Sequence, residues 1–260
     1  MDLHHLMLAP LRTAVSRVIG ATPIGLIPVR VRQGPAKGAR WTFGPFSAYW
    51  RLGGAEADVA AALARLPTIK GIAFWDIGAH YGIHTVGVAM QAGSSGHVAA
   101  FEPDPGAFAR LSRHVTMNKL TNVKLFQAAV SETSGAITLY TPGRLGSANS
   151  HIRHNPQDDM SATPSVIVKT VALDELVASG QIRKPNIIKV DVQGHGHKAL
   201  RGAARTIADS LPIIAFSNHS DMERDGTRAL LEPLGYRPVN LSGEPIKWSA
   251  IKEALLLPLS

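Results

Sequence analysis

Short apolar runs alternate along the chain with longer amphipathic stretches, and this alternation sets the predicted fold. The runs have the length and the β-branched or aromatic content of buried strands. We expect these strands at 71–75, 96–101, 123–130, 186–191 and 212–217. We expect the intervening helices at 83–91, 105–118, 192–208 and 227–234. Such regular alternation predicts an α/β fold with a doubly wound, mostly parallel sheet.

Residues 1–55 are predicted to form a helix and a β-hairpin that cap a main domain at 56–260. Residues 1–19 have apolar positions near helical spacing, but histidine and arginine interrupt them, so they fit neither a membrane span nor a signal peptide. We expect an amphipathic helix that packs on the domain, with a peripheral membrane or partner helix as the alternative. Residues 27–32 and 39–43 alternate apolar and polar positions around a turn with glycine and proline, which predicts the hairpin.

The middle of the chain departs from the regular alternation. A strand at 136–140 follows the third apolar run too closely for a helical crossover, so we expect it to be antiparallel or an added edge. Residues 141–164 lack periodicity, and so long a loop in a compact domain is usually functional, for example as a lid. The remaining expected elements are helices at 56–66 and 173–177 and strands at 165–171, 236–240 and 254–259.

Composition narrows the class of protein. The chain has 260 residues, 45% of them hydrophobic and 18% charged, which suits one folded domain with a small appendage. Its formal net charge of +8 favours an anionic partner or surface. The cations are scattered and do not interleave with aromatic residues, so nucleic acid is the less favoured partner. The chain has no cysteine, which suits a reducing compartment, and we expect it in the cytoplasm.

A glycine-spaced turn follows the first apolar run and is the strongest local sign of a ligand. It contains Asp76, Gly78 and Gly82, and the two glycines let the backbone approach a bound molecule closely. By itself, such a turn fits a dinucleotide site, another nucleotide site or a tight connection. The second apolar run ends in Glu102, where a βαβ unit presents a carboxylate to a ribose, and Pro103 stops the strand there.

Polar residues also end the later strands of the predicted sheet. Asp191 follows the fourth apolar run, and Ser217 ends the fifth. Because ligands of doubly wound sheets bind at the carboxyl ends of the strands, we expect both residues to lie near Asp76 and Glu102. The sequence therefore predicts one site at this edge of the sheet.

Several motifs, taken together, resemble those of the FkbM-type methyltransferases, a branch of the S-adenosylmethionine-dependent methyltransferases. The segment 76–82 is similar to the cofactor loop of that family, and Phe101, Glu102 and Pro103 follow at the corresponding place. The other matching segments are 52–56, 173–176, 188–192, Gly194 and 200–203. The resemblance runs from about residue 52 to the end of the chain and implies a seven-stranded Rossmann-like sheet whose final strand is antiparallel.

The resemblance also implies a cofactor, a reaction and a set of binding residues. The cofactor is S-adenosylmethionine, and the reaction is O-methylation of a hydroxyl on a small acceptor such as a sugar or another secondary metabolite. The chemistry is an in-line displacement, which depends on positioning and is helped by a base. The cofactor-binding residues implied are Glu56, Asp76, Gly78, Ala79, His80, Tyr81, Gly82, Glu102, Pro103, Gln127 and Ala128.

The chain departs from the family pattern on the acceptor side of the site. Gln193, Gly196 and Ser217 stand where the family usually has acids. In one interpretation Asp191 orients the acceptor and His195 or His219 supplies the base, because histidine titrates near neutral pH. In the other, catalysis is weakened and the chain is a cofactor-binding or partner-binding module. We favour the enzyme, and a less acidic pocket suits an anionic acceptor.

Other functions fit the residues less well. In a nicotinamide oxidoreductase the glycine spacing would differ, because His80 stands at the position of the second glycine. A nucleic-acid methyltransferase would show a basic stripe. We expect no metal ion, because His195 and His197, two residues apart, point to different sides of a helix. Among the remaining rings, we expect Trp75 in the core and His114 exposed on its helix.

Overall fold

The structure is a computed structural model that describes residues 28–42, 58–141, 151–152 and 163–259. The predicted N-terminal helix, Glu56 and most of the predicted loop 141–164 lie outside the described residues. Within the described residues no helix is long and apolar enough to cross a membrane.

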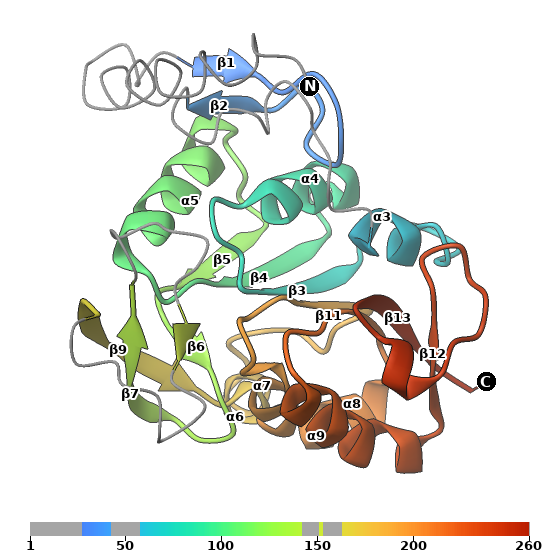
Figure 1. The fold of residues 1–260 in the computed structure, drawn as a ribbon. Coiled ribbons are helices and arrows are strands. Elements are labelled where there is room, and N and C mark those ends of the chain that lie inside the picture. Colours follow the sequence, from blue (N-terminus) through green and yellow to red (C-terminus); the bar gives the residue numbers. More distant parts are fainter. Residues whose placement is uncertain (1–27, 43–57, 142–150, 153–162, 260) are drawn as a thin grey trace, which may run out of the picture.

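A seven-stranded sheet forms the centre of the molecule, as the sequence predicts (Figure 1). Its order is β12-β13-β11-β10-β3-β4-β5, and β13 is antiparallel to both of its neighbours. The strands are β3 (Ala73–Ile77), β4 (His97–Phe101), β5 (Val123–Phe126), β10 (Ile187–Val190), β11 (Ile213–Ser217), β12 (Tyr236–Val239) and β13 (Glu253–Pro258). The antiparallel final strand confirms the topology that the family resemblance implies.

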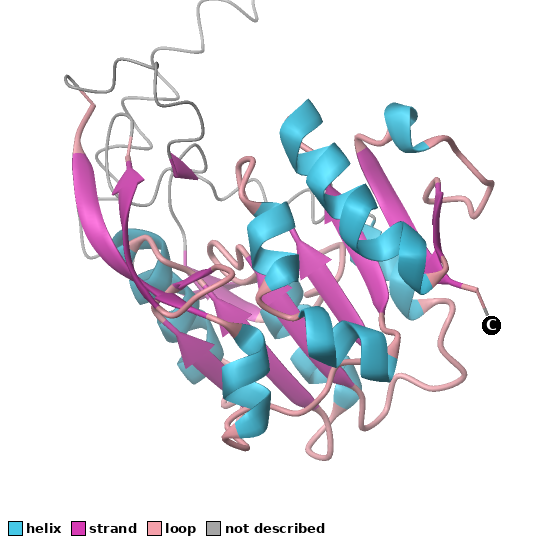
Figure 2. Ribbon diagram, turned by 90° about the horizontal axis from the view of Figure 1, so that it is seen from below, coloured by secondary structure: helices cyan, strands magenta, loops and turns pink. Residues whose placement is uncertain are grey.

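Helices cover both faces of this sheet, because its central strands are apolar on both sides. On one face lie α3 (Asp58–Leu63), α4 (Ile83–Ala92) and α5 (Pro105–Met117) (Figure 1). On the other lie α6 (Leu173–Ala178), α7 (Gly196–Arg201), α8 (Ala204–Ser210) and α9 (Asp221–Leu231), which Figure 2 shows against the strands from below. Alternate β3 residues enter separate cores: Phe74 packs on one side, and Trp75 and Ile77 on the other. Trp75 is 1% exposed, which confirms its assignment to the core.

A second sheet lies beyond β5 and corrects two sequence predictions. The run 123–130 is not one strand, because the chain leaves the main sheet after Phe126 and continues as a separate strand. The predicted strand at 136–140 is antiparallel, as expected, but it belongs to this second sheet. Its strands, in the order β6-β9-β7-β8, are β6 (Ala129–Val130), β7 (Gly135–Tyr140), β8 (His151–Ile152) and β9 (Ser165–Val171).

Two helix predictions also differ from the structure. The region 192–208 contains a turn and then α7 and α8, which are separated at Gly202, where a Cβ would lie 2.0 Å from the Ser131 carbonyl oxygen. The last predicted helix, 227–234, begins six residues earlier, as α9, after its N-cap Ser220. Its first turns are polar and were therefore missed by apolar periodicity. Two short 3₁₀ turns, Glu232–Leu234 and Trp248–Ala250, precede β12 and β13, the last two strands.

The predicted hairpin is present as β1 (Pro28–Arg30) paired antiparallel with β2 (Arg40–Thr42). Its Trp41 is 2% exposed and belongs to the same apolar cluster as Tyr81 and Leu111. The hairpin therefore packs directly on the main sheet's helices. The boundary between an N-terminal cap and a main domain at residue 55 stays a prediction.

His114 joins the hairpin to the main sheet and is not exposed as predicted, since it is 1% exposed. Its ring stacks on Trp41 with centroids 3.6 Å apart. Nδ1 lies 2.8 Å from the Tyr81 carbonyl oxygen and Nε2 lies 2.7 Å from Thr42 Oγ1. A carbonyl only accepts, so Nδ1 carries the proton of the neutral ring and Nε2 accepts from Thr42. Burial lowers the pKa of His114 to about 4, against the raising effect of the Tyr81 hydrogen bond.

Lowering the pH should therefore reduce the stability of the folded chain, because protonation of His114 disrupts this contact. The loss of stability should be smaller in His114→Gln. The unfolded state binds a proton near the ordinary pKa of 6.5, whereas the folded state binds it only near pKa 4, so stability falls as pH drops through this window. From pH 7 to 4.5 this linkage costs the wild type about 2.5 kcal/mol. Urea unfolding at both pH values measures the difference. An equal loss of stability in His114→Gln would contradict the assignment.

Candidate active site

The predicted cofactor loop connects β3 to α4 and lies against β10. Gly78 and Gly82 have φ of +79° and +87°, and His80 also lies in the left-handed region with φ of 49°. The N–H groups of Gly78 and Ala79 both donate to the Phe101 carbonyl oxygen, at 3.1 and 3.0 Å. This anchors the loop to the end of β4. The glycine-spaced turn of the sequence is thus a tight backbone loop at the carboxyl edge of the sheet.

Gly78 allows the loop to touch the neighbouring strand end. A Cβ at this position would lie 2.0 Å from the Asp191 carbonyl oxygen and 3.0 Å from Val192 Cγ1. Any side chain at this position would displace backbone on one side or the other. The requirement for glycine therefore has two causes, the positive φ and the lack of space.

Asp76 lies inside β3, one residue before its end, and not in the turn as the sequence suggested. It is 1% exposed, and one carboxylate oxygen, Oδ2, accepts a 2.5 Å hydrogen bond from Thr85 Oγ1. The other, Oδ1, has no hydrogen-bond partner among the described residues and lies 3.7 Å from Lys189 Nζ. A buried carboxylate oxygen with unused acceptor capacity suits a cationic ligand group.

Glu102 follows β4 directly and is fixed by two backbone donors. His80 N donates to Oε2 at 2.7 Å and Asp104 N donates to Oε1 at 2.8 Å. Burial raises the pKa of Glu102 to about 7, although these two hydrogen bonds act in the opposite direction. Each carboxylate oxygen can accept a second hydrogen bond, so the group remains able to bind a diol.

Lys189 lies between the two halves of the site and was not among the predicted site residues. It is 3% exposed, and its ammonium donates to the Gly78 carbonyl oxygen at 2.8 Å. The same ammonium is 3.7 Å from Asp76 Oδ1 and 3.7 Å from Asp191 Oδ2. A cation in the otherwise apolar strand Ile187–Val190 was the available signal, because buried lysines are almost always paired.

Asp191 and His219 form a close pair next to this lysine. His219 Nε2 lies 2.9 Å from Asp191 Oδ1, and the two side chains are 26% and 31% exposed. Burial alone would raise the pKa of Asp191, but the Lys189 charge and the His219 hydrogen bond hold it well below its usual range. The hydrogen bond to Asp191 raises the pKa of His219 above its ordinary value, against the effect of burial. The structure thus brings together two of the residues predicted for catalysis.

His195, the other candidate base, is in a different setting. It is 3% exposed, and its Nε2 lies 3.1 Å from the Oγ of Ser131, the residue that follows β6. His197 is 5% exposed and packs against α9, where a Cβ on Gly226 would lie 2.9 Å from its ring. Among the described residues, no three His, Asp or Glu side chains form a group able to hold a metal ion.

The remaining predicted cofactor residues lie in the loop or just after β4 and β5. Tyr81 is 5% exposed and stacks on His80, with centroids 3.8 Å apart, while the Arg110 guanidinium lies 4.9 Å from the Tyr81 ring centroid. Gln127 and Ala128 follow β5, where Gln127 is exposed and Ala128 is buried. Pro103 is half-buried between Glu102 and Asp104, the N-cap of α5.

These features fit S-adenosylmethionine. The loop is a tight backbone turn with no room for a side chain at Gly78 or Gly82, since a Cβ on Gly82 would lie 2.4 Å from Leu111 Cδ1, so a ligand there meets backbone groups. Asp76 Oδ1 offers an acceptor for an ammonium group, and Glu102 offers acceptors for two hydroxyls. Ammonium and diol are the polar ends of that molecule.

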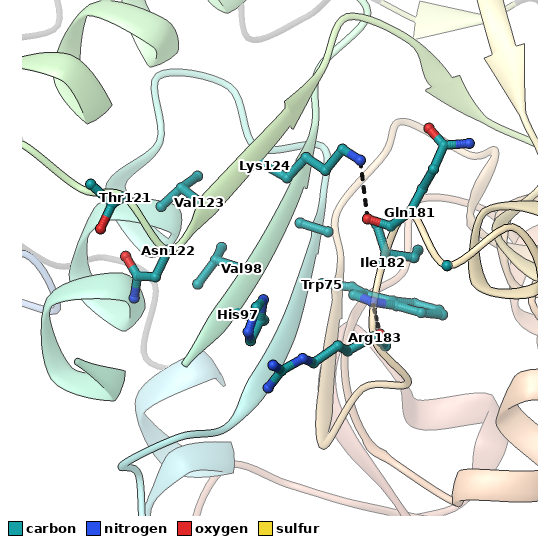
Figure 3. A pocket seen from close by; sticks show the side chains of 12 residues that line it. Trp75, His97, Val98, Thr121, Asn122, Val123, Lys124, Gln181, Ile182 and Arg183 are labelled. Carbon is teal, nitrogen blue, oxygen red and sulfur yellow. Dashed lines mark hydrogen bonds between the residues drawn. The ribbon is translucent and has the colours of Figure 1, made fainter. Parts of the chain in front are cut away.

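A separate hollow of about 390 Å³ lies at the amino ends of β4 and β5 (Figure 3). His97 and Val123, the first residues of β4 and β5, line it. Lys124 Nζ donates to the Gln181 carbonyl oxygen at 3.2 Å and Trp75 Nε1 donates to the Arg183 carbonyl oxygen at 3.0 Å across it. Because it lies at the amino ends of the strands, this hollow is not the cofactor site.

Comparison with known proteins decides the family. Residues 76–238, which include the loop, Glu102, Asp191 and His219, match the Methyltransferase FkbM domain. The chain belongs to the FkbM methyltransferase family. It is therefore a methyltransferase that uses S-adenosylmethionine, as the motifs predict.

Relatives of this FkbM methyltransferase include the hexuronic acid methyltransferase AglP of Haloferax volcanii. The two are 30% identical over 197 residues, which cover 75% of this chain and 76% of AglP. Among solved structures, Methyltransferase FkbM from Methylobacillus flagellatus is 17% identical with a TM-score of 0.49, and covers 81% of this chain. This chain spans about half, 52%, of that protein. The putative methyltransferase yhhF of Escherichia coli is 14% identical, with a TM-score of 0.45, and covers 89% of this chain and 97% of its own.

Proposed function

We propose that this enzyme methylates a hydroxyl oxygen of an acidic sugar, and that His219, held by Asp191, is the base. The observation that carries the proposal is the 2.9 Å contact between His219 Nε2 and Asp191 Oδ1 beside the cofactor loop. The acceptor class is supported by the 30% identical relative named for hexuronic acid.

The donor half of the site holds and orients the cofactor. Bound S-adenosylmethionine supplies a methyl group on a positively charged sulfur. We assign its ammonium to Asp76, its ribose hydroxyls to Glu102, and the backbone of Gly78–Gly82 to the methionine part between them. We assign the adenine to Gln127 and Ala128, which follow β5. Because the displacement needs an in-line arrangement, these contacts contribute to the rate through positioning.

The acceptor half removes the hydroxyl proton. A carboxylate only accepts, so the proton of neutral His219 lies on Nε2 toward Asp191, which leaves Nδ1 as an acceptor. Nδ1 takes the hydroxyl proton as the oxygen forms its bond to the methyl carbon. The imidazolium produced is stabilised by Asp191, whose lowered pKa keeps it ionised. His195 is a weaker candidate, because it is 3% exposed and engaged with Ser131.

An anionic acceptor also agrees with the charges of the chain. Gln193, Gly196 and Ser217 remove carboxylates from the segment around Asp191, and the chain carries a formal charge of +8. Fewer acids at the pocket reduce repulsion of a carboxylate-bearing sugar. The cytoplasm as its location, and contact of residues 1–19 with a membrane, stay predictions.

Methyl-transfer assays test the reaction and the acceptor class together. Labelled S-adenosylmethionine is incubated with the enzyme and with oligosaccharides that contain glucuronic or galacturonic acid, and matched neutral hexose oligosaccharides serve as the control. We expect label in the acidic series, in a product that survives mild alkali, because alkali cleaves a methyl ester and leaves a methyl ether. Alkali-labile product, or preference for the neutral series, would contradict the proposal.

Calorimetric titration separates this enzyme from the alternatives. We expect binding of S-adenosylmethionine and none of NAD. Donor binding without transfer to any saccharide would favour a cofactor-binding module. Acceptor activity on RNA that falls steeply with salt would favour a nucleic-acid methyltransferase.

A further inference from the structure

Glu223 is a buried acid that belongs to neither half of the site described above. It lies in the first turn of α9 and is 0% exposed. Its Oε1 accepts a 2.6 Å hydrogen bond from Gly196 N, and its Oε2 accepts a 2.7 Å hydrogen bond from His219 N. One carboxylate therefore joins the first residue of α7 to the residue that we assign as the base.

The space next to Glu223 explains why residue 196 has no side chain. A Cβ on Gly196 would lie 2.6 Å from Glu223 Oε1, 2.9 Å from Val190 Cγ1 and 3.1 Å from Phe216 Cε2. The carboxylate of Glu223 thus occupies the volume that a side chain at position 196 would enter. A carboxylate from α9 therefore lies where α7 has no side chain.

We infer that Glu223 is the positioning residue of the His219–Asp191 pair, holding the backbone of His219 so that its ring stays against Asp191. This inference rests on the proposed role of His219. It assigns to Glu223 no contact with the acceptor. Two N–H donors need two acceptor oxygens, and a carboxylate supplies both, whereas an amide supplies one.

The charge of Glu223 also acts on the His219 ring. The ionisable groups that face this ring are Asp191 and Lys189 from the end of β10 and Glu223 from α9. Asp191 and Glu223 raise the pKa of His219, while burial and Lys189 lower it. Burial raises the pKa of Glu223 itself, against its two backbone hydrogen bonds. Removing the Glu223 charge should therefore lower the pKa of His219.

The test compares Glu223→Gln with Asp221→Asn in the full chain. Both variants remove one acid from the first turn of α9, but the Asp221 side chain is 86% exposed and contacts Arg224. NMR titration of the His219 ring gives its pKa without any acceptor. We expect a lower His219 pKa in Glu223→Gln, and wild-type behaviour in Asp221→Asn. An unchanged His219 pKa in Glu223→Gln would overturn the inference.

Steady-state kinetics with a saccharide that the enzyme methylates give the second readout. We expect Glu223→Gln to lower kcat by about tenfold or more, since misplacing a general base forfeits part of its contribution. Affinity for S-adenosylmethionine should be unchanged, and the acidic limb of the pH profile should move to lower pH. If the wild type methylates no saccharide, the proposed function fails, while the NMR titration still tests Glu223.

The native protein provides a measurement that needs no variant, should Glu223→Gln fold poorly. Amide hydrogen exchange should be slow at both Gly196 and His219, because each N–H is held by the buried carboxylate. Exchange at His219 as fast as at the exposed start of α9 would overturn the inference.

A double-variant cycle tests the packing of Glu223 against residue 196. Gly196→Ala should destabilise the wild type more than it destabilises Glu223→Ala, because that variant lacks the carboxylate oxygen that the added Cβ would meet.

Discussion

His219→Ala should slow methyl transfer by about 10²- to 10⁴-fold, the usual contribution of a positioned base, and should leave the affinity for S-adenosylmethionine unchanged. The expectation follows from the contact of His219 with Asp191 and from the separate location of the cofactor loop. Asp191→Asn should slow the reaction as well, because an amide can present its N–H to Nε2 and favour the wrong tautomer. Donor binding is measured by calorimetry, and turnover by label transfer to the acidic oligosaccharides.

The pH dependence distinguishes a base from a structural residue. A base must be unprotonated, so the rate rises with pH through the pKa of His219, which lies above its ordinary value. Asp191→Asn removes the main cause of that elevation and should move the rise to lower pH. His97→Ala, at the other end of the sheet, is the histidine control. Full activity in His219→Ala together with a large loss in His195→Ala would instead assign the base to His195.

Gly78→Ala should lower the affinity for S-adenosylmethionine by at least about a hundredfold, equivalent to about 2.7 kcal/mol. The added Cβ would lie 2.0 Å from the Asp191 carbonyl oxygen, at a φ of +79°, so either the loop or the end of β10 must move. Calorimetry measures the affinity, and thermal unfolding checks that the chain still folds.

Gly180→Ala is the matched control for this substitution. Gly180 also has a positive φ, of +68°, but nothing lies within 4 Å of the added Cβ. It therefore isolates the backbone strain from the steric clash. Wild-type affinity in Gly78→Ala would mean that the loop is only a tight connection and not the donor site.

The sheet could be predicted because its strands are long apolar runs with clear ends. The central strands and the helices α4 and α5 lie within a few residues of their predicted bounds, since apolar periodicity reports burial directly. The prediction failed where burial did not define the element. The run 123–130 stays apolar while the chain passes from one sheet to another, and α9 starts in a polar turn.

The site was predictable where residues stand beside glycine turns or strand ends, as at Gly78, Glu102 and Asp191. It was not predictable where contacts join distant segments. Glu223 approaches Gly196 through the packing of α9 on α7, and only a local cap pattern with Ser220 marks it in the sequence. His114 was assigned to solvent because helical position alone does not reveal a hairpin from residues 28–42 stacked above it.

The single ammonium of Lys189 has a consequence for how the two ligands bind. It lies 3.7 Å from a carboxylate on the donor side, Asp76, and 3.7 Å from one on the acceptor side, Asp191. If the donor's ammonium binds Asp76, as we propose, it would compete with Lys189 for that carboxylate and shift the interaction of Lys189 toward Asp191. Binding of the donor would thus change the affinity for the acceptor, and thermodynamic linkage requires the acceptor to change the affinity for the donor equally. Donor and acceptor should therefore alter each other's affinity by the same factor, although their binding residues are different.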